Sequence, residues 1–168
     1  FITVYQNLMV AVFVGVIIAI LKSLNQLISK SNYKYKVVSI LDSDFALNQK
    51  QKKELDALSV KVLKINGPLF FGSTEQLISA YNNAPNHKVL IIDMSIVSSI
   101  DLTGIYSLED LVKGAQSNGI ITYVSNANQN IKQMMNNVHF IENIGKEYYT
   151  DSTESLIFHI LENNNQNI

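Results

Sequence analysis

The stretch IIDMSIVSSIDLTG, residues 91–104, decides the fold class. It begins inside a nearly all-apolar run, Lys88–Asp93, which is typical of a central strand that is covered on both faces. It ends with DLTG, in which Asp101 can cap a helix that runs from Leu102 to about Ser117. A buried strand, a short loop and a capped helix form the repeating unit of an α/β domain.

The segments on either side continue this alternation of strands and helices. The sequence predicts further strands at 37–41, 60–66 and 120–124, and further helices at 50–58, 73–82, 127–137 and 152–161. We therefore predict one α/β domain over residues 37–162, in which helices pack against a mixed sheet. The Asn-rich end, residues 163–168, is expected to be a disordered tail.

An apolar segment precedes this domain. Leu8–Leu21 is unbroken apolar sequence, no charge occurs before Lys22, and further lysines follow. As a helix, the 21 residues before the first charge would span about 31 Å, close to the thickness of a bilayer core. We predict that residues 1–28 end the last transmembrane helix of a longer protein, with its C-terminal end in the cytoplasm. Residues 29–36 would be a basic linker. A helix buried in a soluble core and a lone membrane anchor are the alternatives.

The composition argues against several classes of protein. Residues 37–168 carry nine lysines, no arginine and 14 acidic residues, so this part is acidic and is not expected to bind nucleic acid. The chain has no cysteine, and its three histidines share no metal-ligand spacing. The segment GPLFFGST, residues 67–74, lacks the lysine of a phosphate loop. We expect neither an enzyme nor a bound metal or cofactor.

The loop between the central strand and the capped helix is the candidate site. Free backbone N–H groups at a helix start can hold an anion or a partner's carboxylate. The simpler interpretation is structural, with Asp101 as a cap and Gly104 letting the helix approach the sheet. The sequence leaves both interpretations open. The candidate residues are Asp93, Ser95, Ser98, Ser99, Asp101, Thr103 and Gly104.

The same loop resembles the signature of STAS domains, which occur in sulfate transporters and anti-sigma-factor antagonists. In the antagonists the pattern is D-x-S, a spacer and D-S-[ST]-G, whose first serine is phosphorylated. Here Leu102 stands at that position and cannot accept phosphate, although Ser99 and Thr103 are neighbouring hydroxyls. GPLFFG at 67–72, and IGKE at 144–147 followed by an aspartate, resemble segments of the transporter members.

This resemblance implies a STAS-type fold and a regulatory role without catalysis. The chain would be the cytoplasmic domain of a secondary anion transporter of the sulfate permease (SulP) family in the cell inner membrane. Sulfate, bicarbonate or dicarboxylates would be its anions. Its implied partners are its own transmembrane domain, the membrane through residues 1–28, a second copy and a regulatory protein. The alternatives are a stand-alone switch like the anti-sigma-factor antagonists and a small nucleotide-binding enzyme.

Overall fold

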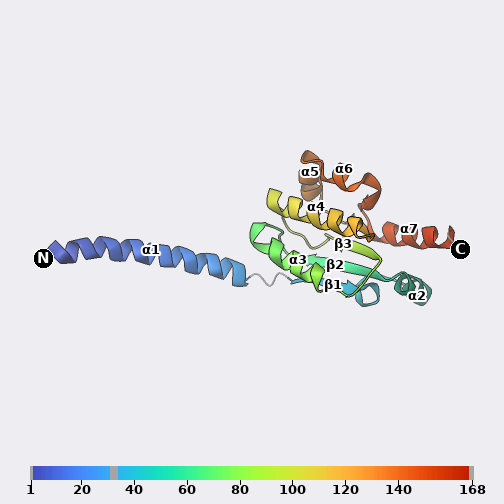
Figure 1. Ribbon diagram of the computed structural model, residues 1–168, viewed down its shortest axis with the longest axis horizontal. Helices are drawn as coiled ribbons and strands as arrows, with labels where there is room; N and C mark the ends of the chain where they lie inside the picture. Colours follow the sequence, from blue (N-terminus) through green and yellow to red (C-terminus); the bar gives the residue numbers. More distant parts are fainter. Residues whose placement is uncertain (1, 31–33, 167–168) are drawn as a thin grey trace. The chain divides into compact units, whose positions relative to one another are not determined.

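The computed structural model describes residues 2–30 and 34–166, with side chains at 8–23 and 35–162 (Figure 1). The chain divides into two units, Phe1–Asn32 and Tyr33–Ile168. The first unit is a single helix, α1 (Ile2–Lys30), whose side chains are exposed throughout its described part.

The predicted helix is therefore present, but the predicted membrane span is not confirmed. Among the described residues, no helix is both long enough and apolar enough to cross a membrane. Helix α1 also continues past Lys22 to Lys30, and the first strand begins at Lys34, inside the predicted linker.

The second unit is built on a mixed sheet, as predicted, and the sheet has five strands. Strand β1 (Lys34–Ser39) pairs antiparallel with β2 (Val60–Asn66). Strands β3 (Val89–Asp93), β4 (Ile121–Ser125) and β5 (Tyr149–Thr150) follow in parallel, and the order in the sheet is β1-β2-β3-β4-β5. Every residue of β3 is buried, as expected of a central strand. The two-residue β5 was not predicted.

Helices cover both faces of the sheet. One face packs against α3 (Thr74–Asn82), α4 (Leu102–Ser117), α5 (Gln129–Asn137) and α6 (Phe140–Ile144), and it forms the larger apolar core. The other packs against the 3₁₀ turn η1 (Ile40–Asp42), α2 (Gln49–Ala57) and α7 (Thr153–Gln166). The remaining 3₁₀ turns are η2 (Phe71–Ser73) and η3 (Lys146–Tyr148). Helix α7 extends four residues into the predicted tail.

Alternation along the strands explains why both faces are apolar. Leu63 and Ile65 of β2 enter the larger core, whereas Val60 and Val62 enter the other. In an extended strand, successive side chains point to opposite faces. A strand between two helical layers therefore needs apolar residues at both its odd and its even positions. Helices on both faces of a mostly parallel sheet leave the loops at its edges to present polar groups.

Candidate functional site

The loop after β2 and the loop after β3 are joined by backbone hydrogen bonds. The N–H of Leu69 donates to the carbonyl of Ser99 at 2.9 Å, and the N–H of Asp101 donates to the carbonyl of Leu69 at 3.1 Å. Leu69 and Ile100 thereby form an isolated parallel bridge. The hydroxyl of Tyr35, on β1, donates to the carbonyl of Pro68 at 2.8 Å and so links the loop after β2 to β1.

Asp101 caps α4, as the sequence predicts, and it also holds the neighbouring loop. One carboxylate oxygen, Oδ1, accepts from the N–H of Gly104 at 2.6 Å. The other, Oδ2, accepts from the N–H of Phe71 at 3.3 Å. Gly104 lets the helix start approach the loop closely, because a Cβ atom there would overlap the carbonyl oxygen of Leu69. This close approach is to the loop rather than to the sheet.

Asp93 lies in a separate, buried polar network and is 7% exposed. Its Oδ1 accepts from the N–H of Ser95 and from Nδ2 of Asn126, both at 3.1 Å, and its Oδ2 accepts from the Ser95 hydroxyl at 3.0 Å. Asn126 also donates to Oγ1 of Thr153 at 2.7 Å and accepts from the Thr153 N–H at 3.2 Å. The hydroxyls of Ser125 and Thr153 lie 2.7 Å apart. The network thus joins the ends of β3 and β4 to the first residue of α7.

Sequence reasoning missed three members of this network, Ser125, Asn126 and Thr153. Asn126 has a φ of 60°, in the left-handed region that asparagine enters more readily than most residues. A signal existed, because Ser125 and Asn126 end the strand next to β3. The carboxyl ends of neighbouring parallel strands meet at one edge of a sheet, so polar residues there are expected to lie together.

The candidate residues therefore fall into two groups, and no hydrogen bond between described residues joins one group to the other. Asp93 and Ser95 belong to the buried network, and Asp101 and Gly104 belong to the helix start. The hydroxyls of Ser98, Ser99 and Thr103 are exposed and form no hydrogen bond with any other described residue. The arrangement presents hydroxyl groups to a partner or an anion, and it holds no paired acid and base for catalysis.

Large apolar side chains are exposed on the same loops and on the first turns of α4. Phe71 is 76% exposed, Ile96 56%, Leu102 54% and Tyr106 52%. We name these four residues the apolar platform. The exposure of Phe71 is unusual for a large aromatic side chain. Its backbone N–H is drawn to Asp101, on the outer side of the loop, and its ring faces solvent. An exposed group of apolar residues is typical of a contact surface.

The aspartate that follows the IGKE segment forms an ion pair beside β5. Nζ of Lys132 lies 2.7 Å from Oδ1 and 2.5 Å from Oδ2 of Asp151, and the Tyr149 hydroxyl donates to Oδ1 at 3.1 Å. The hydrogen bond from Lys132 lowers the pKa of Asp151 below its ordinary value of 3.8. Burial, followed by the charge of Asp151, raises the pKa of Tyr149 above its ordinary value of 10.0. No group of three or more metal-ligating side chains occurs among the described residues.

The structure is thus an α/β domain whose loops after β2 and β3 expose apolar side chains and hydroxyl groups. The family model of the STAS domain matches residues 50–155. The chain belongs to the STAS domain family, and it is not an enzyme. The predicted resemblance and the predicted fold class are thereby confirmed.

Curated relatives and solved structures agree with this assignment. The bicarbonate transporter BicA of Synechocystis is 24% identical over 157 residues, covering 92% of this chain and 28% of the relative. The probable sulfate transporter 3.5 of Arabidopsis thaliana is 30% identical over 98 residues, covering 55% of this chain and 16% of the relative. This chain thus spans less than a third of either relative.

Among solved structures, a sulfate transporter family protein from Wolinella succinogenes is 28% identical, with a TM-score of 0.56, and the match covers 63% of this chain and 89% of that one. The STAS domain of a SulP transporter from Vibrio cholerae is 21% identical, with a TM-score of 0.57, over 71% of this chain and 99% of that one. SLC26A9 is 18% identical, with a TM-score of 0.65, over 89% of this chain and 27% of that one. The last two likenesses show the fold.

Proposed function

We propose that this chain is the regulatory domain of a secondary anion transporter of the SulP type, on the cytoplasmic side of the cell inner membrane. The observation that carries the proposal is the STAS match together with the likeness to the bicarbonate transporter BicA over 92% of the chain. Because the likeness extends beyond residues 50–155, it includes sequence outside the matched domain. Sulfate and bicarbonate are the candidate anions, after the names of the relatives.

In this proposal the domain at 37–162 controls transport through contact and not through chemistry. Residues before it join it to the rest of the transporter. The apolar platform and the hydroxyls of Ser98, Ser99 and Thr103 form the surface that contacts the transmembrane domain, a second copy or a regulatory protein. Exposed apolar side chains with polar neighbours support a contact of this kind.

The alternative is a stand-alone switch of the anti-sigma-factor-antagonist type, and Leu102 argues against it. A switch of that type requires a hydroxyl at this position to accept phosphate. A leucine that is 54% exposed supplies apolar contact area instead. Thr103, one residue further on, is the hydroxyl that a phosphorylation assay would test first.

Anion uptake by the whole transporter in proteoliposomes tests the proposal. We expect uptake of sulfate or bicarbonate, and we expect Leu102→Asp to reduce it at an unchanged amount of reconstituted protein, because a charge would be placed in an apolar contact. Phe158→Asp is the matched control, since Phe158 is 59% exposed and lies on α7, outside the platform. Absence of uptake of both anions would refute the transporter assignment. Equal effects of the two variants would refute the role of the platform.

A further inference from the structure

A groove runs between α3 and α4, away from the loops described above. Its volume is ≈ 280 Å³. Ile78 and Tyr81 of α3 and Leu111 of α4 give it apolar walls, and the small residues Ser107 and Gly114 also line it along α4. A Cβ atom added to Gly114 would meet nothing within 4 Å, so the helix surface there is open. The two helices that form the groove are drawn in green and yellow in Figure 1.

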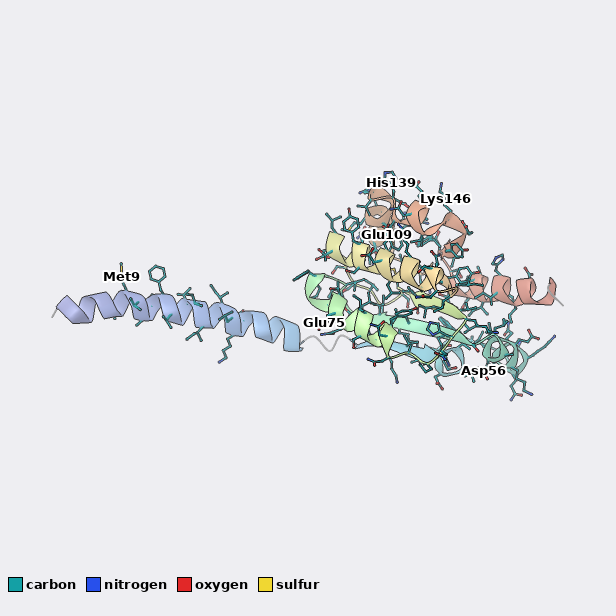
Figure 2. All side chains as sticks on the ribbon, viewed as in Figure 1. Met9, Asp56, Glu75, Glu109, His139 and Lys146 are labelled. Carbon is teal, nitrogen blue, oxygen red and sulfur yellow. The ribbon has the colours of Figure 1, made fainter. Side chains whose placement is uncertain are left out.

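Among the described residues of α3 and α4, the charged side chains that lack an ion pair are both acidic. Asp110 lines it, and Glu75 lies nearly one turn before Ile78 on α3 (Figure 2). Neither carboxylate has an ion pair or a side-chain hydrogen bond to any described residue. Helix α3 has no lysine, and the lysine of α4, Lys113, is paired with Glu109 at 2.5 Å. Two unpaired acids thus flank an apolar groove.

The length of the groove suits a short helix. Its lining on α4 extends from Ser107 to Asn118, which corresponds to about 16 Å along the helix axis, or three turns. A helix can pack closely where the facing residues are small, and an amphipathic helix in an apolar groove is a recurring mode of peptide recognition. Unpaired acids at the groove favour a partner helix with lysine or arginine beside its apolar face.

We propose that the α3–α4 groove binds a basic amphipathic helix of a partner protein. The apolar face of that helix packs on Ile78, Tyr81 and Leu111, and its cations pair with Asp110 and Glu75. This site is separate from the apolar platform, and it goes beyond the proposed role in transport. An anionic membrane is disfavoured as the occupant, because the two carboxylates would repel it.

A second groove on the opposite face of the sheet provides a contrast within the same domain. It has a volume of ≈ 220 Å³ and is lined by Phe45, Leu47, Ile157 and Phe158, among others. Glu154 also lines this groove, but helix α2, which contributes Gln51 to the lining, carries three lysines in its first five residues, QKQKK, so the charges here are mixed. Its surroundings are therefore less suited to a basic helix, and Phe158 serves as the control position.

The experiment uses residues 33–168, which contain every residue of both apolar cores. These residues form one of the two compact units of the chain, and the solved Vibrio cholerae STAS domain shares the fold over 99% of its own length. The probes are two dye-labelled peptides of about 14 residues with the same amphipathic helical pattern, one of leucine and lysine and one of leucine and glutamate. Binding is measured by fluorescence anisotropy, and amide shifts in NMR spectra locate the site.

We expect the leucine–lysine peptide to bind, with shifts concentrated in α3 and α4, and the leucine–glutamate peptide to bind at least about tenfold more weakly. Gly114→Leu, which fills the groove, and Asp110→Lys, which reverses a charge, should each weaken binding about tenfold. Phe158→Asp should leave it unchanged. Asp110→Lys alters an exposed side chain, so it tests the groove even if Gly114→Leu fails to fold.

Two results would overturn the proposal. Binding of the leucine–lysine peptide that Asp110→Lys leaves unchanged would show that the groove is not its site. Binding of vesicles containing anionic phosphatidylserine that shifts the same α3 and α4 amides, and competes with the peptide, would assign the groove to a membrane surface.

Discussion

Two aspartates bound the connection between β3 and α4, and they act in opposite ways. Asp93 is 7% exposed and accepts two hydrogen bonds from Ser95 and one from Asn126, on the neighbouring strand's loop. Asp101 is exposed and accepts from backbone N–H groups of Gly104 and Phe71. The first carboxylate fixes how distant elements meet inside the domain, and the second shapes a surface. The difference shows that a candidate site can contain scaffold and contact residues within one loop.

The largest effect on stability is expected at Gly104, where the start of α4 closely approaches the backbone of the loop after β2. Gly104→Ala should lower the free energy of unfolding by about 3 kcal/mol, because the new Cβ atom would overlap the carbonyl of Leu69. Urea denaturation measures it. The matched control is Gly114→Ala, which meets open space in the same helix and should raise stability by about 0.5–1 kcal/mol. Similar effects of the two variants would show that the approach is looser than described.

The next effect probes the buried side of the comparison. Asn126→Ala should lower the free energy of unfolding by about 2–3 kcal/mol, since it removes the hydrogen bonds to Asp93 and Thr153. It also places an alanine at a φ of 60°, a conformation that alanine disfavours. Asn126→Gly keeps the backbone conformation accessible and should cost about 1 kcal/mol less. Thermal unfolding of both variants separates the two contributions. An alanine variant as stable as the native chain would show that the network around Asp93 and Asn126 does not stabilise the domain.

Loss of the Asp101 cap should have a smaller effect. Asp101→Ala should cost about 1 kcal/mol, because the N–H of Gly104 loses its partner at a solvent-exposed helix start. Asp101→Ser retains a capping oxygen and should recover most of this loss. Hydrogen exchange should also increase at the amides of Phe71 and Gly104 in the alanine variant. A loss larger than that of Asn126→Ala would reverse the comparison.

The smallest effect concerns a third carboxylate, which is exposed and paired with a lysine. The hydrogen bond from Lys132 lowers the pKa of Asp151 below 3.8, so the pair contributes stability above that pH. This contribution is lost as the pH falls through the lowered pKa. The difference in Tm between the native chain and Asp151→Asn should therefore be small near neutral pH and disappear in strong acid. A difference that grew toward low pH would contradict the lowered pKa.

The sequence predicted those parts of the fold that depend on local patterns. The nearly all-apolar strand β3, the helix α4 and the cap at Asp101 follow from an apolar run that ends at Asp93 and a capping residue eight positions further on. The mixed α/β class follows from repeating that pattern. The cap at Asp101 was predicted correctly, because helix starts have a chemistry that a short stretch of sequence can show. Gly104 allows a close approach, as predicted, but to the neighbouring loop and not to the sheet.

The remainder depends on contacts between distant residues. Asn126 bonds to Asp93 across 33 positions of sequence and to Thr153 across 27, and no local pattern indicates such pairings. Strand β5 has two residues, which is too short for a period to be visible. Phe71 has a large apolar side chain of the kind usually found in a core, and it is 76% exposed only because it lies on the outer side of the loop. Burial is a property of the assembled domain.

The order of the strands also bears on how the domain is made. The strands lie in the sheet in the order in which they occur in the chain, β1-β2-β3-β4-β5. Each new strand pairs with the one synthesised before it, so during translation the sheet can grow at one edge without waiting for a distant partner. Helix α7 comes last and supplies Leu156, Ile157 and Ile160 to the smaller core. That face is therefore the last to be sealed as the chain leaves the ribosome.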